Sequence, residues 1–195
     1  MKRAAPLAAT LIAGFLQTQP GQPVTLELRV FHGYEEVTRR VRATVHRAGD
    51  RGEAVAQRDP AEGSLEFALP EGIYDAQVFE EIDGKVLNIR WANRLVVMRY
   101  PDEGGRHLEV VNFANGYGAL QVRPASGTPI ELTLYPPGGR ERPAAAAIQG
   151  TDYSLFVVPA GVYDLLVKVR GKSVWHTGVE VPLDRTRFWV LPEQG

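Results

Sequence analysis

The residues that could carry metal or acid–base chemistry are scattered along this chain. Four histidines occur, and none stands at a metal-ligand spacing from another: His32, His46, His107 and His176. The chain has no cysteine, which removes thiolate nucleophiles, disulfides and Cys-ligated zinc or iron–sulfur centres. We therefore expect no metal site and no cofactor.

One stretch of the sequence is dense in carboxylates: Asp75, Glu80, Glu81 and Asp83. Oxygen-rich clusters at hairpins can bind calcium. This stretch lacks the D-x-[DN]-x-[DN]-G order of a calcium-binding loop. A solvated hairpin is the favoured interpretation, and a calcium site stays open as the alternative.

Nucleophilic and phosphate chemistry also lack a motif. The serines lie in neither a G-x-S-x-G nor an S-x-x-K context: Ser64, Ser126, Ser154 and Ser173. The glycines of Gly116-Tyr117-Gly118 are not followed by the helix that a phosphate cradle needs. The chain is predicted not to be an enzyme.

Composition narrows the class of protein further. The 195 residues include 22 Lys plus Arg and 23 Asp plus Glu, for a formal charge of −1. This balance argues against a general nucleic-acid surface, which needs a strongly basic face. With 44% apolar and 23% charged residues, the chain has the composition of a folded protein rather than a disordered one.

The amino terminus has the layout of a secretory signal peptide. Met1-Lys2-Arg3 is basic, residues 4–16 are almost wholly apolar, and residues 17–23 are polar and rich in proline. The apolar stretch is too short to span a bilayer, and no later stretch is long enough. We expect a signal peptide over residues 1–22 and a periplasmic or secreted mature chain with no membrane span. An N-terminal helix packed on the core is the alternative.

Apolar residues recur with a period of two, which indicates strands with one buried face. The clearest run is Val24, Leu26, Leu28 and Val30, which alternate with Thr25, Glu27 and Arg29. Turn signals recur about every 8 to 12 residues, as in antiparallel β-sandwiches. The predicted fold class is all-β.

The strand pattern occurs twice. A shift of 89 residues aligns residues 41–78 with residues 130–167 without a gap, and ten of the 38 columns are identical. Several identities are glycines and prolines, where backbone geometry is demanding. We predict two tandem antiparallel β-sandwich domains, residues 23–114 and 115–195.

A seven-residue motif at positions 69–75 returns at positions 158–164. Proline is expected to end one strand, glycine to take a positive φ, and tyrosine to bond the loop backbone as in a tyrosine corner. The aspartate is expected to accept backbone or lysine hydrogen bonds. The predicted structural-corner residues are Pro70, Gly72, Tyr74 and Asp75, then Pro159, Gly161, Tyr163 and Asp164.

Each P-x-G-[IV]-Y-D corner is followed by a strand, a Gly-Lys hairpin and a tryptophan, Trp91 in the first copy and Trp175 in the second. This arrangement resembles the carboxypeptidase regulatory-like, or transthyretin-like, β-sandwich repeats of exported bacterial proteins. The resemblance implies a non-catalytic accessory or interaction module whose partner lies on another chain.

Aromatic residues are the remaining candidates for binding. Trp91, Trp175 and Trp189 are predicted to pack in the cores or between domains, although together they could form a stacking platform for sugar rings. For contact with a partner the predicted residues are Tyr117, Tyr135 and Trp189. The favoured function is an exported, non-enzymatic protein-interaction or structural module of the cell envelope. A carbohydrate-binding module using exposed aromatics is the alternative.

The corner assignment predicts a measurable loss of stability. Replacing Tyr74 or Tyr163 with Phe removes one buried hydrogen bond and lowers the free energy of unfolding by about 1 to 2 kcal/mol. Thermal melts of the two variants beside the parent protein measure this loss. An unchanged melting midpoint in both variants would refute the assignment.

Overall fold

The structure is a computed structural model that describes residues 22–60, 65–100, 104–125 and 130–191. Within these ranges every regular element is a β-strand except one 3-10 helix, Thr38–Arg40, so the all-β prediction is confirmed. None of the helical structure in this part of the chain is long and apolar enough to cross a membrane. The signal peptide predicted for residues 1–22 lies outside the described residues, apart from Gln22.

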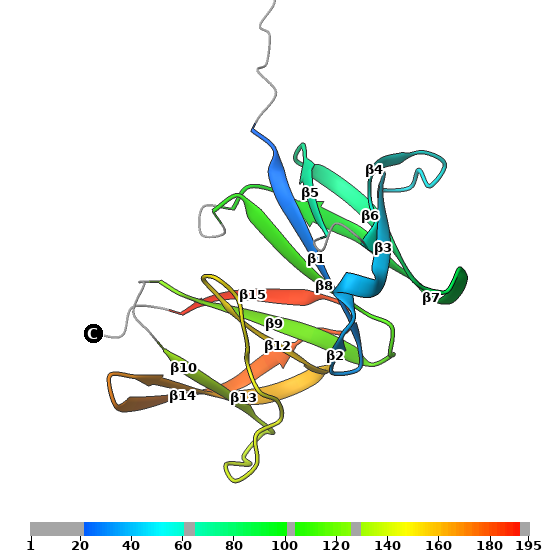
Figure 1. The fold of residues 1–195 in the computed structure, drawn as a ribbon. Coiled ribbons are helices and arrows are strands. Elements are labelled where there is room, and N and C mark those ends of the chain that lie inside the picture. Colours follow the sequence, from blue (N-terminus) through cyan, green and yellow to red (C-terminus); the bar gives the residue numbers. More distant parts are fainter. Residues whose placement is uncertain (1–21, 61–64, 101–103, 126–129, 192–195) are drawn as a thin grey trace, which may run out of the picture.

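The strands of residues 24–112 form two sheets (Figure 1). In sheet A, β1 (Val24–His32) pairs antiparallel with β2 (Glu35–Glu36) and β5 (Glu66–Leu69), and pairs parallel with β8 (Arg106–Asn112). Sheet B is antiparallel, with the order β4 (Ala54–Arg58), β3 (Val41–Arg47), β6 (Gly72–Ile82) and β7 (Lys85–Val97).

The strands of residues 117–191 repeat this pattern. In sheet C, β9 (Tyr117–Pro124) pairs antiparallel with β12 (Ser154–Pro159) and parallel with β15 (Thr186–Leu191), and β11 (Ile148–Gln149) extends the other side of β12. Sheet D has the order β10 (Glu131–Tyr135), β13 (Gly161–Val169) and β14 (Lys172–Val181). The expectation of purely antiparallel sheets is therefore wrong for one strand pair in each half. β8 runs parallel to β1, and β15 runs parallel to β9.

The register of the inner strands is the same in the two halves. Leu26 of β1 lies opposite Phe67, and Leu120 of β9 lies opposite Phe156. Phe67 and Phe156 are separated by 89 residues, the shift that aligns the two copies of the sequence. The same strand pattern therefore produces the same pairing twice.

Each pair of sheets encloses an apolar cluster of its own. The first cluster includes the alternating residues of β1 together with Phe67 and Tyr74, and all of these side chains are buried. The second includes Leu120, Phe156 and Leu165. Burial of one face per strand explains the period of two in the sequence.

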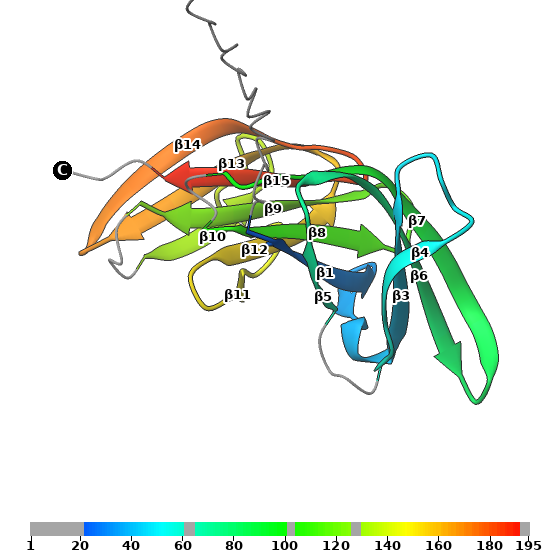
Figure 2. The ribbon, with the colours of Figure 1, turned by 90° about the horizontal axis from the view of Figure 1, so that it is seen from above.

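A third apolar cluster joins the two halves. Phe31, Leu108 and Val110 of sheet A meet Ala119, Leu155 and Val157 of sheet C and Tyr153, which directly precedes β12. In each strand these side chains point to the face opposite to the one that lines the first or second cluster. The sheets are therefore stacked in the order B, A, C, D, and the third cluster covers part of the second face of A and of C (Figures 1 and 2).

Gly118 of β9 lies close to the backbone of Pro182. A Cβ atom at this position would lie 1.9 Å from the carbonyl oxygen of Pro182 and 3.1 Å from the side chain of Val181. A glycine inside a strand often marks such an approach of another backbone. Here it lets β9 pass the segment that joins β14 to β15.

Replacing Gly118 with Ala is predicted to lower the free energy of unfolding by about 2 kcal/mol or more, because the backbone must move to admit the methyl group. Denaturant unfolding measures the change. Gly139→Ala is the matched control, since the nearest atom to its added methyl group would be 3.4 Å away. Equal losses in the two variants would contradict the steric explanation.

Candidate functional site

Both corner tyrosines bond the proline that precedes them. The hydroxyl of Tyr74 donates to the carbonyl oxygen of Pro70 at 2.7 Å, and that of Tyr163 donates to Pro159 at 2.6 Å. Tyr74 is buried, whereas Tyr163 is partly exposed. The expectation of a buried bond is therefore wrong for Tyr163, where water can replace the bond, and the larger loss of stability is expected for Tyr74→Phe.

The corner glycines differ from expectation. Neither Gly72 nor Gly161 has a positive φ, because each begins the next strand in extended conformation. A Cβ on Gly72 would lie 3.3 Å from the ring of Tyr74. The small residue is therefore explained in the first copy by the approach of the tyrosine ring and not by a left-handed turn.

The corner aspartates fasten their strand to the segments on both sides. Asp75 accepts hydrogen bonds from the backbone N–H of Arg94 at 2.8 Å and of Gly49 at 3.3 Å. Asp164 accepts bonds from Gly138 at 2.9 Å and Gly178 at 3.3 Å. Both carboxylates are buried, and each lies at a β-bulge between its strand and the next. These contacts hold each corner against the two neighbouring segments.

Two of the tryptophans are covered by arginine. The guanidinium of Arg51 lies 4.2 Å from the ring centre of Trp91, and that of Arg140 lies 4.7 Å from Trp175. A second ring stands beside each tryptophan, His46 at 5.5 Å and Tyr135 at 5.3 Å. The guanidinium takes space that a sugar ring would need on that face, so a platform of free, coplanar tryptophans is not formed.

Sequence reasoning missed the two arginines, although a signal for them was present. Arg51 and Arg140 are separated by 89 residues and form one of the identical columns of the repeat. The neighbouring rings, His46 and Tyr135, are separated by the same interval. The pair of covered tryptophans is thus a duplicated feature of the fold.

The three predicted partner-contact residues have different surroundings. Tyr117 lies edge-on to Tyr34 at 5.3 Å, Tyr135 stands against Trp175, and Trp189 lies edge-on to His176 at 5.1 Å. All three are partly buried, and Trp189 packs against the second core. Tyr34, the neighbour of Tyr117, is the more exposed ring, with 58% of its surface accessible.

The acidic stretch of the first copy does not converge on one point. Glu80 is buried and accepts a bond from Asn88 at 2.6 Å, Glu81 lies 3.7 Å from Arg42, and Asp75 occupies the corner. In the described ranges no three histidine, aspartate or glutamate side chains gather closely enough to hold a metal ion.

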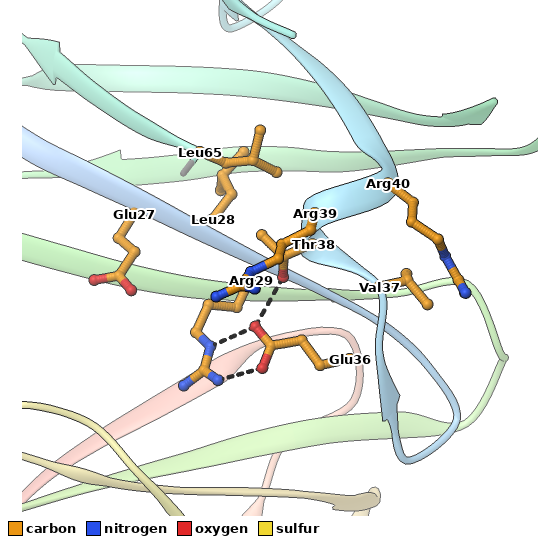
Figure 3. Close-up of a pocket in the computed structure, with 9 residues that line it drawn as sticks. All are labelled: Glu27, Leu28, Arg29, Glu36, Val37, Thr38, Arg39, Arg40 and Leu65. Carbon is orange, nitrogen blue, oxygen red and sulfur yellow. Dashed lines mark hydrogen bonds and ion pairs between the residues drawn. The ribbon is translucent and has the colours of Figure 1, made fainter. Parts of the chain in front are cut away.

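Charged residues line a groove beside sheet A, on the face that turns toward the other half of the chain. One hollow of about 430 Å³ is lined by Glu27, Arg29, Glu36, Arg39, Arg40 and their apolar neighbours (Figure 3). A second, of about 640 Å³, shares Glu27 and Arg29 and reaches Asp152 and Tyr153 of the other half. We call the two together the ionic groove; it borders the junction of sheets A and C.

Several charges of the ionic groove are paired within the protein. Arg29 donates two hydrogen bonds to Glu36, one of them 2.9 Å long, and Thr38 donates to the same carboxylate at 2.9 Å (Figure 3). Arg106 bridges Glu27 at 2.5 Å and Glu66 at 2.8 Å. Such Arg–carboxylate pairs fix the positions of the side chains.

The electrostatics of the ionic groove do not favour proton transfer. Burial alone would raise the pKa of Glu36, but its bonds to Arg29 and Thr38 and the charges of Arg29 and Arg39 together lower the pKa below the ordinary value. The bonds of Arg106 to Glu66 and Glu27 raise the pKa of its guanidinium. A general acid near neutral pH needs a carboxyl whose pKa is raised, and Glu36 moves the other way. The lowered pKa of Glu36 therefore does not suit this carboxyl to act as a general acid near neutral pH.

The fold and these surfaces define an all-β protein with repeated corners. No model of a known protein family matches the chain, and no curated protein matches it at a significant level.

Some solved structures resemble the chain weakly. The Bacillus anthracis TIE protein is 17% identical over 86% of this chain and 33% of that chain, with a TM-score of 0.34. The tip fimbrial protein Mfa3 from Porphyromonas gingivalis is 11% identical over 88% of this chain and 96% of that one, with a TM-score of 0.32. The C-terminal fragment of pilus adhesin SpaC from Lactobacillus rhamnosus GG is 10% identical over 89% and 100%, at 0.25.

This chain thus spans about a third of the length of the TIE protein chain. The scores are too low to transfer a property from any of these proteins. The proposals below therefore rest on the residues of this chain.

The corner carboxylate makes stability depend on pH. Burial alone would raise the pKa of Asp75, but the N–H groups of Arg94 and Gly49 and the charge of Arg51 lower it below the ordinary value of 3.8. The unfolded chain therefore binds this proton more readily than the folded chain does. The stabilisation is complete above pH 3.8 and is lost as the pH falls through the lower, folded value.

We predict that Asp75→Asn lowers the melting temperature at neutral pH, and that its difference from the parent protein shrinks in acid below pH 3.8. Melting curves across this pH range measure the effect. Asp50→Asn, on an exposed side chain of the neighbouring turn, is the control. A difference between parent and Asp75→Asn that stays constant with pH would contradict the role of the ionised carboxylate.

Proposed function

We propose that this protein is an exported, non-enzymatic interaction module of the cell envelope, which acts by binding another protein. In this proposal residues 1–22 are a signal peptide and the mature chain is periplasmic or secreted. Residues 23–114 and 115–195 are its two β-sandwich domains. In the first half β1 pairs with β5 and β8, and in the second half β9 pairs with β12 and β15 in the same way. This repetition supports the division.

The observation that carries the proposal is a group of exposed aliphatic side chains at one hairpin. The hairpin joins β6 to β7, and its exposed fractions are 42% for Ile82, 51% for Val86, 55% for Leu87 and 55% for Ile89. Val86 and Ile89 share one face of the hairpin, because they pair with Glu81 and Phe79. Isolated exposed apolar residues are common, but neighbouring ones on one face are typical of a surface that another molecule covers. We call this group the aliphatic tip.

The resemblance to carboxypeptidase regulatory-like repeats supports the same proposal. Such repeats imply an accessory module with a partner on another chain. The paired corners at Tyr74 and Tyr163, with their equivalent bonds to Pro70 and Pro159, support that resemblance. Membership of this family remains a proposal.

Carbohydrate binding is the second candidate function. The observation in its favour is the exposed ring of Tyr34 edge-on to Tyr117 at the junction of the two halves. Against it, arginines lie over the rings of Trp91 and Trp175. The protein-binding proposal is therefore preferred.

The two functions are separated by one binding experiment. The purified full chain is immobilised and exposed to envelope proteins of the source cells and, separately, to a panel of soluble glycans. We expect saturable binding of a protein with a Kd below about 10 μM, no saturable glycan binding, and no change in the Tyr34→Ala variant. A glycan that binds the parent but not Tyr34→Ala would instead establish the carbohydrate function. If no envelope protein binds saturably, the proposal is overturned.

A further inference from the structure

The aliphatic tip occurs in one of the two copies. β7 has 13 residues and its counterpart β14 has 10, so the first hairpin is the longer one. In the second copy the tip is polar and exposed throughout: Arg170, Gly171, Lys172 and Ser173. The same fold is thus built without an apolar tip, which means that the aliphatic residues are not needed for folding.

Strand β7 also has a free edge. It stands last in the order of sheet B, so among the described strands it has a neighbour on one side only. Near its far end, Arg185 of the other half donates to the carbonyl oxygen of Asn93 at 2.6 Å and covers the edge there. No described strand lies beside the stretch from Lys85 to Ala92, in which Arg90 bonds Asp184 of the other half through its side chain. A row of unpaired backbone groups of this length can accept an added strand.

The geometry of the tip argues against insertion into lipid. The turn places Asp83 and Lys85 on either side of Gly84, at the outermost point of the hairpin. Two charged side chains would therefore enter the bilayer first, at a large cost in hydration. A protein surface can instead contact the aliphatic residues and leave these charges in water.

The charge of β7 argues against a second copy of the same strand. From Lys85 to Val97 the ionisable residues are Lys85, Arg90 and Arg94, and none is acidic. Arg90 pairs with Asp184 at 2.5 Å, while no described carboxylate pairs with Lys85 or Arg94. Two such strands side by side would bring like charges together, which is destabilising. A segment with acidic residues is complementary.

From these observations we infer that the free edge of β7, together with the aliphatic tip, binds an extended segment of a partner protein in which apolar residues alternate with acidic ones. The inference rests on the proposed function and adds the surface and the chemistry of the partner. Backbone hydrogen bonds along Lys85 to Ala92 hold the segment. Val86 and Ile89 select its apolar residues, because their partners across the hairpin, Glu81 and Phe79, place them on one face of the sheet.

The test uses two short synthetic peptides, one alternating glutamate with valine and one alternating lysine with valine. Binding to the full chain is measured by calorimetry, and amide hydrogen exchange locates the contact. We expect the glutamate peptide to bind at least about tenfold more tightly than the lysine peptide and to slow exchange between Lys85 and Ala92. Lys85→Glu reverses the preference, and Ile89→Thr weakens binding about tenfold.

Lys172→Glu is the matched control, because Gly171-Lys172 of the second hairpin corresponds to Gly84-Lys85 of the first. We expect this variant to bind as the parent does. Equal effects of Lys85→Glu and Lys172→Glu, or equal binding of the two peptides, would overturn the inference. A dimer of the parent chain in sedimentation, lost in Ile89→Thr, would assign the edge to a second copy and also overturn it.

Failure of this inference can be told apart from failure of the proposed function. If neither peptide binds while an envelope protein still binds the full chain, the surface is wrong and the interaction function stands. If the envelope protein binds the parent and the Ile89→Thr variant equally, the same conclusion follows. The melting temperature of each variant checks that it is folded, and the exposure of the substituted side chains predicts that it stays close to that of the parent.

Discussion

Burial of apolar side chains on both faces of sheets A and C is the constraint on which this structure depends. Each of these sheets lines a core of its own and also contributes to the cluster that joins the halves. β1 therefore sends Leu26 to one side and Phe31 to the other. An outer sheet needs one apolar face, but an inner sheet needs apolar residues on both. If Leu155 and Val157 were polar, the apolar contact between sheets A and C would be lost.

The strand pattern was predictable because it depends on local sequence. Alternation along Val24 to Val30 follows directly from one buried face, and the identity of Phe67 with Phe156 reflects equal places in the register. The parallel pairing of β8 with β1 was not predictable in this way, because it joins segments about eighty residues apart and no turn links them. Nothing in the residues of β8 itself distinguishes a parallel from an antiparallel neighbour.

The candidate site was harder to predict, for a related reason. Residue type alone pointed to Tyr117, Tyr135 and Trp189, yet each of these rings has a separate aromatic neighbour. The arginine over each tryptophan comes from a loop distant in sequence, so composition could not reveal it. The aliphatic tip was visible only after the pairing of β6 with β7 showed which side chains no other strand covers.

The stacking of equivalent sheets, A against C, has a consequence for how the molecule can specialise. If two identical subunits met through these sheets, they would share one sequence. Any change to a hairpin would then occur in both subunits. With both copies on one chain, each hairpin can vary alone. Both hairpins have a polar turn, at Gly84 and at Gly171, but the first is longer and carries exposed aliphatic side chains beside its turn. Duplication within a single polypeptide thus permits a molecule with one distinctive end, which a symmetric pair could not have.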